Sequence, residues 1–378
     1  MPTRHFLVSL GLITLGLVET ALADDALTQA EEQRTDAYAL QLEEYLSELL
    51  VEGYDARADA AWSRDYTSEA AFLESVAPNR ERWRELLSPL ALKTTGPLES
   101  TPYEPLAELG AQWLRVPLGG LYAEALLVVP TNGEGPFPLV IAQHGIGSYP
   151  ELIFGLNDKS GNYHAYGSEL VKAGFAVLAP MNLRSMPRRN RIERLCRLAD
   201  TTLPGIEFTR VQRLLDEVLQ DPRIDADRVG MWGLSLGGLA TMFWTPLEPR
   251  IKASVVAGWF NHRRNKMVHT DKRYSCFLDT TEEHAFFRGW LTEFTDHDVV
   301  SLICPRPLLI QTGKKDGIAW WPMVEEEFAI ARTHYEKLGI PERAELDLQD
   351  VGHEAHVESG VRFLRHWLVE NFTALDKK

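Results

Sequence analysis

A serine stands between glycines in RVGMWGLSLGGLATMFW, where a run of β-forming residues gives way to a helical pattern. Within it, Gly233-Leu234-Ser235-Leu236-Gly237 fits G-x-S-x-G, a sharp strand-to-helix turn that holds a nucleophilic serine above a sheet. Glycines are needed because larger side chains at those positions would collide with the neighbouring strand and helix. The pattern predicts Ser235 as a nucleophile, and a tight packing turn is the alternative.

A serine hydroxyl needs a general base, and that base needs a carboxylate to orient it. After such a turn the expected chain order is serine, acid, histidine. Asp316 follows the apolar segment RPLLIQTG, and His353 follows RAELDLQ just before the last helical pattern. We therefore predict Ser235, Asp316 and His353 as the catalytic residues. Four other residues stay open as the acid or the base: Asp296, Asp298, Asp350 and His356.

The same chemistry needs backbone donors for a developing oxyanion. One is expected from Leu236, the residue after the nucleophile. The second should come from the loop AQHGIGSYPE, where the N–H of Ile146 is the first choice and that of Gly145 the next. In this reading, His144 holds the loop through hydrogen bonds.

These residues must be positioned by alternating strands and helices. Apolar, β-rich segments lie at 112–118, 121–130, 139–145, 175–180, 228–233, 251–259, 306–313 and 343–349. Helical patterns lie between most of them, which predicts an α/β protein with a mostly parallel sheet covered on both faces. The first two segments form a hairpin and add an antiparallel edge. In such sheets the ligand site lies beyond the carboxyl ends of the strands, where the predicted catalytic residues fall.

The N-terminal region has two expected parts. Residues 1–23 show a basic start, an apolar run and a small-x-small site at Ala21–Ala23, which predict a signal peptide and a secreted or periplasmic protein. Residues 24–95 are expected to form a helical cap, followed by the main domain at 96–378 with an insertion at 259–304. The cap's predicted buried face is made by Leu42, Tyr45, Leu46, Leu49 and Leu50.

Composition excludes some classes of function. A net charge of −15 over 378 residues argues against nucleic-acid binding, since phosphates are bound by a basic face. The three cysteines, Cys196, Cys276 and Cys304, do not have the spacing of a zinc site. Their odd number leaves at least one thiol free, and a Cys196–Cys276 disulfide and three buried thiols both stay open. No metal and no cofactor are expected.

Two segments could shape a substrate pocket. The insertion is rich in aromatic residues, among them Trp259, Phe277 and Trp290, which we expect to form mainly its own core. Trp320 and Trp321 follow Asp316 closely. The segment RSMPRRNRIERLCR could attract a carboxylated substrate such as a uronate, but we expect a solvated helix paired with the acidic N-terminal region.

Over roughly residues 100–378 the chain resembles the α/β-hydrolase superfamily, through HGIG, GLSLGG, GKKDG and DVGH. DPRIDADRVGMWGLSLGG is similar to the region before the nucleophile in dienelactone hydrolase-like, acetyl xylan esterase-like and prolyl oligopeptidase-like members. The resemblance implies an eight-stranded sheet, a Ser-Asp-His triad and no cofactor. Dienelactone hydrolases use cysteine where Ser235 stands, and glucuronoyl esterases carry arginine where Leu236 stands, so the chain departs from both.

Together these features predict an exported serine hydrolase that cleaves carboxylic esters through an acyl-enzyme. Its expected partner is a small-molecule or carbohydrate ester, of the acetyl xylan type, with no membrane span after signal cleavage. A serine peptidase resembling prolyl oligopeptidase and a non-catalytic binding protein of the same fold are the alternatives.

Overall fold

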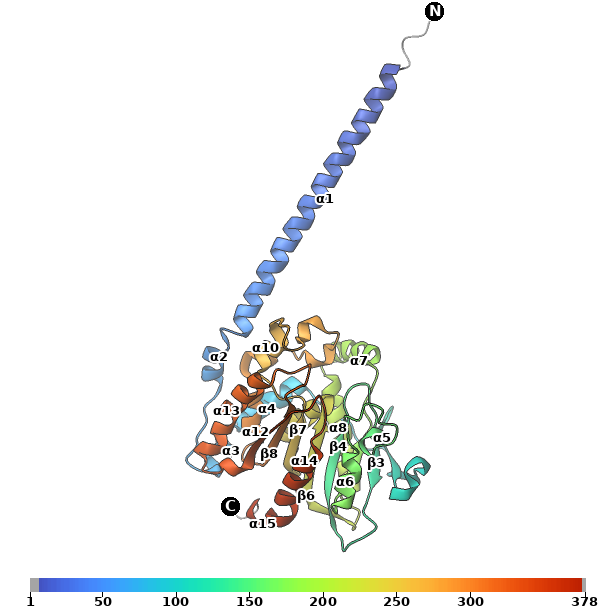
Figure 1. Ribbon diagram of the computed structural model, residues 1–378, viewed down its shortest axis with the longest axis vertical. Coiled ribbons are helices and arrows are strands. Elements are labelled where there is room, and N and C mark those ends of the chain that lie inside the picture. Colours follow the sequence, from blue (N-terminus) through green and yellow to red (C-terminus); the bar gives the residue numbers. More distant parts are fainter. Residues whose placement is uncertain (1–6, 376–378) are drawn as a thin grey trace, which may run out of the picture. The chain divides into compact units, whose positions relative to one another are not determined.

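The computed structural model describes residues 7–375, with side chains for residues 25–373 (Figure 1). It divides into two compact units, one up to Gly53 and one from Tyr54 onward. The first unit consists mainly of one helix, α1 (Leu7–Leu50). Among the described residues, no helix is both long and apolar enough to cross a membrane.

The predicted apolar face of α1 is exposed. Leu42, Tyr45, Leu46 and Leu49 are all solvent-accessible on this helix, and their packing against the main domain stays a prediction. A single helix has no partner within its own unit against which such a face could pack. The predicted signal peptide, residues 1–23, lies outside the residues with described side chains. The predicted boundaries at residues 23 and 95 stay predictions.

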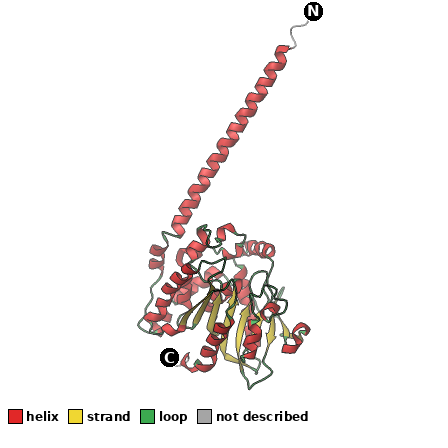
Figure 2. Cartoon of the chain, in the orientation of Figure 1, coloured by secondary structure: helices red, strands yellow, loops and turns green. Residues whose placement is uncertain are grey.

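One sheet of nine strands organises the second unit (Figure 2). Its spatial order is β1-β2-β3-β5-β4-β6-β7-β8-β9. The strands are β1 (Glu99–Pro102), β2 (Gln112–Pro117), β3 (Tyr122–Val128), β4 (Phe137–Gln143), β5 (Ala176–Pro180), β6 (Ile224–Leu234), β7 (Ile251–Ala257), β8 (Leu308–Gly313) and β9 (Ala344–Gln349). The strands from β5 to β9 pair in parallel, and β1, β2 and β3 form the antiparallel edge. The mostly parallel sheet is confirmed, and the short β1 extends it by one strand beyond the eight implied by the resemblance.

Helices cover both faces of this sheet, as predicted. The helices of this unit are α2 (Tyr54–Ala61), α3 (Glu69–Ser75), α4 (Ala77–Leu87), α5 (Pro150–Ile153), α6 (Tyr166–Lys172), α7 (Met186–Leu198), α8 (Leu203–Val218), α9 (Leu236–Trp244), α10 (Arg263–Val268), α11 (Trp290–Glu293), α12 (Asp296–Ile303), α13 (Trp321–Lys337), α14 (Val357–Arg365) and α15 (Phe372–Leu375). On one face, α6 and α14 bury Leu170 and Phe363 against Trp232 of β6. On the other lie α8 and α9 (Figure 1).

Helices α2 to α4 and the insertion are joined by buried contacts. Trp62 Nε1 donates to the Glu293 carbonyl at 2.8 Å, and Trp83 Nε1 donates to the Phe243 carbonyl at 3.0 Å. The Trp83 ring packs edge-on against Phe243 of α9, with 4.9 Å between centroids, and lies 5.2 Å from the ring of Phe294 in the insertion. Part of the aromatic content of the insertion therefore belongs to a core that it shares with α4 and α9.

Candidate active site

Ser235 occupies a strained turn between β6 and α9. Its φ of 61° and ψ of −118° lie outside the regions that non-glycine residues normally adopt, which costs of order 1–3 kcal/mol. Two hydrogen bonds hold the turn: Ser235 N–H donates to the Ala257 carbonyl at 2.9 Å, and Leu239 N–H donates to the Ser235 carbonyl at 3.0 Å. The surrounding backbone thus fixes the serine in its unusual conformation at the carboxyl end of β6.

The glycines around Ser235 are dictated by close backbone contacts. A Cβ atom on Gly233 would lie 2.0 Å from the carbonyl oxygen of Gly237. A Cβ atom on Gly237 would lie 2.0 Å from the carbonyl oxygen of Gln143 on β4. No side chain fits at either position, so the steric argument made from the sequence holds in the structure.

His353 and Asp316 meet beyond the ends of β9 and β8. His353 Nδ1 lies 2.7 Å from Asp316 Oδ2, and the other carboxylate oxygen accepts the Ile318 N–H at 2.9 Å. The Asp316 side chain is buried, while that of His353 is about a quarter exposed. Because Asp316 engages Nδ1, the nitrogen left for a reacting group is Nε2.

Ser235 and His353 face the same space. Both line an enclosed pocket of about 260 Å³ and an open cleft of about 720 Å³, and Ile146 borders both cavities. Within the described residues, no hydrogen bond joins Ser235 Oγ to His353 Nε2. Such bonds are often long before substrate binds, so the arrangement is compatible with a serine–histidine pair.

The alternative acids and base have other partners. Asp296 pairs with Arg263, and Asp298 pairs with Arg64 and Tyr54. Asp350 is exposed and lies 2.8 Å from Lys315 Nζ. His356 caps α14 and contacts Asp347 at 3.0 Å. Of the four candidate acids, only Asp316 contacts His353 in the described hydrogen bonds.

The loop after β4 carries the predicted oxyanion donors. Gly145 N–H donates to the Tyr163 hydroxyl at 2.8 Å, so this N–H is already used and Gly145 does not serve as a donor in this conformation. Ile146 N–H has no acceptor among the described residues. Leu236 is the first residue of α9, where the backbone N–H has no acceptor within the helix. Ile146 and Leu236 therefore remain the predicted donors.

His144 fastens this loop, as expected. Its Nδ1 lies 2.9 Å from the Gly145 carbonyl, and Nε2 accepts the Asn182 N–H at 3.1 Å. Burial lowers the pKa of His144 to about 4, which keeps the ring neutral at neutral pH. A neutral ring can donate through Nδ1 and accept through Nε2 at the same time.

Two aromatic walls and several polar groups line the enclosed pocket. Trp259 and Phe277 supply the rings, 5.6 Å apart between centroids. Lys266 Nζ donates to Ser275 and to the Ile318 carbonyl, and burial lowers the pKa of its ammonium to about 8. Burial raises the pKa of Glu282 at the same pocket. The aromatic residues of the insertion are thus divided between its core and this pocket.

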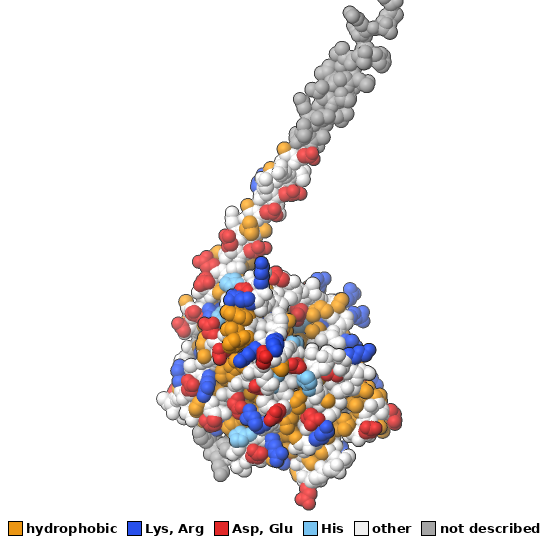
Figure 3. All heavy atoms as spheres, in the orientation of Figure 1, with side chains coloured by type: hydrophobic (Ala, Val, Ile, Leu, Met, Phe, Trp, Pro, Cys, Tyr) orange, Lys and Arg blue, Asp and Glu red, His pale blue; other side chains and the backbone are white. Residues whose placement is uncertain are grey.

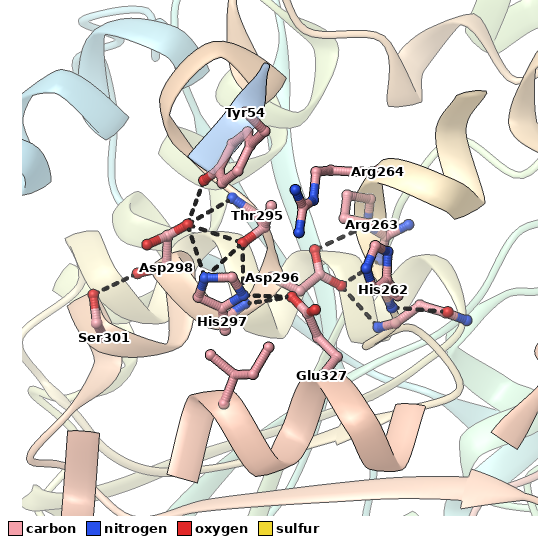
Figure 4. Close-up of polar contacts among 12 residues, drawn as sticks. Tyr54, His262, Arg263, Arg264, Thr295, Asp296, His297, Asp298, Ser301 and Glu327 are labelled. Atoms are coloured by element: carbon pink, nitrogen blue, oxygen red, sulfur yellow. Dashed lines mark hydrogen bonds and ion pairs between the residues drawn. The ribbon is translucent and has the colours of Figure 1, made fainter. Parts of the chain in front are cut away.

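Arg263 forms part of the pocket wall and is held by a buried ionic network (Figure 4). Its Nε and Nη2 donate to the two oxygens of Asp296 at 2.9 and 2.7 Å, and both side chains are fully buried. Nearby, His297 Nδ1 lies 2.9 Å from Glu327 Oε1. Burial opposes protonation of His297, but the carboxylates of Glu327 and Asp298 outweigh it and raise its pKa.

Three contributors to this site could not be predicted from the sequence. Tyr163, Lys266 and Arg263 act through contacts with residues distant in the chain, and no local pattern marks them.

The three cysteines are free and buried. Among the described residues, no group of three histidine, cysteine or acidic side chains is placed to hold a metal ion.

Comparison with known proteins supports the fold assignment. No family model matches the chain. The Bacillus subtilis protein named "Putative hydrolase YtaP" is 27% identical over 259 residues, which cover 65% of this chain and 84% of that protein.

Solved structures resemble this chain at low sequence identity. A "putative acetyl xylan esterase" from Bacteroides fragilis has a TM-score of 0.58 at 17% identity, covering 75% of this chain and 78% of that one. A CE15 glucuronoyl esterase from Teredinibacter turnerae has a TM-score of 0.58 at 15% identity, covering 82% and 90%. With the sheet order and the turn at Ser235, these similarities establish that the chain has the α/β-hydrolase fold.

Proposed function

We propose that this protein is a serine hydrolase that cleaves carboxylic esters, with Ser235, His353 and Asp316 as its catalytic residues. The observation that carries the proposal is the 2.7 Å contact between His353 and Asp316, at a pocket that Ser235 also lines. This is the chain order and the placement that a nucleophile, its base and an orienting acid require.

The proposed reaction has two halves. Ser235 Oγ attacks the ester carbonyl while His353 Nε2 takes its proton, and the Leu236 and Ile146 N–H groups stabilise the oxyanion. The bond to the alcohol breaks, His353 returns the proton to the leaving alkoxide, and an acyl-enzyme remains. Water, deprotonated by His353, then attacks the acyl carbonyl. The bond between the acyl carbon and Ser235 Oγ breaks, His353 returns the proton to Ser235, and the acid is released. Asp316 keeps the imidazole oriented and stabilises its charged form.

We further propose a carbohydrate ester as the substrate. The enclosed pocket combines the faces of Trp259 and Phe277 with the polar side chains of Asn261 and Glu282. Aromatic faces with hydrogen-bonding groups around them suit a sugar ring or a small acyl group with polar substituents. The names of the similar structures, acetyl xylan esterase and glucuronoyl esterase, agree with this class of substrate.

Export is proposed on the N-terminal sequence alone. The basic start, apolar run and Ala21–Ala23 site support a signal peptide cleaved after Ala23 and a secreted or periplasmic enzyme.

The first test is hydrolysis of p-nitrophenyl acetate, butyrate and octanoate by the wild type and by Ser235→Ala. The enclosed pocket favours short acyl groups, so acetate and butyrate should be cleaved faster than octanoate. Ser235→Ala should lower kcat by at least about 10⁴-fold with an unchanged melting temperature. A folded wild type that cleaves peptides and no ester would favour the peptidase. Failure of a fluorophosphonate to label it would favour the binding protein.

A further inference from the structure

The open cleft beside Ser235 has an unusual charge. Its lining residues include two cations, Lys159 and Arg184, and no aspartate or glutamate. The chain as a whole carries a net charge of −15. The lining of the cleft is therefore positively charged although the chain as a whole is negatively charged. This positive lining lies directly beside the proposed nucleophile.

Neither cation is neutralised by the protein. Among residues 25–373, no carboxylate lies within ion-pair distance of Lys159 or Arg184. Other arginines of the same segment are paired: Arg189 is buried against Glu207 at 2.6 Å, and Arg194 contacts Glu283. For Arg189 and Arg194, the expected pairing with the N-terminal acidic region is wrong, because carboxylates of α8 and the insertion take that place.

Arg184 is held at the cleft. Its guanidinium lies over the ring of Tyr149, 4.9 Å from the centroid, and its carbonyl accepts the Gly147 N–H at 3.0 Å. Gly147 belongs to the loop that carries Ile146. The backbone of Arg184 is therefore hydrogen-bonded to the loop that carries the predicted oxyanion donor Ile146.

The acid nearest to Lys159 in sequence is occupied by its own turn. Asp158 Oδ1 accepts the Ser160 hydroxyl at 2.7 Å and the Gly161 N–H at 3.0 Å, and Oδ2 accepts the Tyr163 N–H at 3.1 Å. Asp158 does not line the cleft. These hydrogen bonds hold the Asp158 carboxylate against its own turn, while the Lys159 side chain is exposed.

From this geometry we infer that the open cleft binds a carboxylate-bearing part of the substrate, so that the ester cleaved is carried on an acidic carbohydrate. The inference rests on the proposed esterase function. The small group enters the enclosed pocket, and the larger anionic part lies along the cleft. Guanidinium and ammonium donors left without protein partners are suited to carboxylates, which accept two hydrogen bonds.

The first experiment compares two acetate esters that differ only in charge, 3-acetoxybenzoate and 3-acetoxybenzamide. Rates are divided by those of hydroxide-catalysed hydrolysis to remove differences in leaving-group reactivity. The wild type should favour the carboxylate about 3- to 10-fold in kcat/KM, the size expected of two exposed ion pairs. About 1 M NaCl, where the Debye length falls to about 3 Å, should remove most of this preference.

Variants assign the preference to the cleft. Lys159→Gln with Arg184→Gln should bring the two esters to equal kcat/KM, because both cations of the cleft are then replaced by neutral amides. Arg188→Gln on α7 removes an exposed arginine that does not line the cleft, and it should keep the preference. A wild type without preference, or a double variant that retains it, would overturn the inference while ester cleavage itself stood.

A binding measurement decides the case in which neither ester is cleaved. By calorimetry, Ser235→Ala should bind polygalacturonate more tightly than highly methyl-esterified pectin, and adding the two glutamine substitutions should abolish the difference. Equal binding of the two polymers would overturn the inference. Binding that discriminates between them without any ester cleavage would support carboxylate binding in the cleft. It would contradict the proposed function and, with it, the assignment of the cleaved ester to an acidic carbohydrate.

Discussion

Replacing Gly258 with alanine tests the position of His353 without substituting any of the proposed catalytic residues. Gly258 follows β7, and its φ is +60°, a conformation that glycine adopts freely. An alanine Cβ there would lie 2.7 Å from His353 Cε1 and 3.0 Å from Nδ1. Carbon atoms in contact normally stand about 3.5–4.0 Å apart, so the imidazole must move by about 1 Å.

Two separate costs follow from this change. A displacement of about 1 Å at a catalytic group lowers the rate about 100-fold, which corresponds to about 2.7 kcal/mol of transition-state stabilisation. The left-handed backbone costs alanine about 1–2 kcal/mol of folding free energy in addition. The shift also strains the 2.7 Å contact between His353 and Asp316.

Gly339→Ala is the matched control. Its φ is +73°, and nothing lies within 4 Å of the added Cβ. Both variants should lose about 1–2 kcal/mol in urea unfolding. Only Gly258→Ala should lose about 100-fold in kcat/KM for p-nitrophenyl acetate. A Gly258→Ala enzyme with normal kcat/KM, destabilised like its control, would refute His353 as the base.

Two further predictions concern the oxyanion loop and acid stability. Tyr163→Phe leaves the buried Gly145 N–H without an acceptor, so it should lower the free energy of unfolding in urea by about 1–3 kcal/mol. It should also lower kcat more than it raises KM. An unchanged kcat would show that Tyr163 does not position the loop. Burial lowers the pKa of His144 to about 4, and those of His284 and His334 to about 3. The unfolded chain therefore binds protons first as pH falls below about 6.5, and each ring should cost about 2 kcal/mol at pH 5. His297 acts in the opposite direction through its raised pKa, and an unchanged urea midpoint between pH 7 and pH 5 would contradict the net loss.

Local patterns explain why the serine turn and the sheet could be predicted. The apolar strands, the helix repeats and the glycines of the turn are encoded within short stretches, and parallel topology then places their ends along one edge. Asp316 could be ranked by chain order, but its contact with His353 depends on how β8 and β9 pair. That register joins residues more than thirty positions apart, which periodicity does not contain.

Side chains that act between segments could not be found in this way. Tyr163 contacts Gly145 across a loop, and Arg263 depends on Asp296 thirty-three residues later. In RSMPRRNRIERLCR the composition alone does not tell Arg189, which is buried against Glu207, from Arg184, which borders the cleft. Periodicity places an apolar face on α1, but it does not say which surface that face packs against.

Two groups of residues in the site differ in how substitutions there affect the reaction. The turn that holds Ser235 is packed through direct contacts between backbone segments. Gly237 approaches Gln143, and Gly238 approaches Ala257, too closely for any side chain. The pockets are instead lined by side chains of the insertion and of surface loops, such as Phe277 and Arg184. Substitutions in the second group can therefore alter which ester is bound without moving the nucleophile. Substitutions in the first group disturb the reaction of every ester alike.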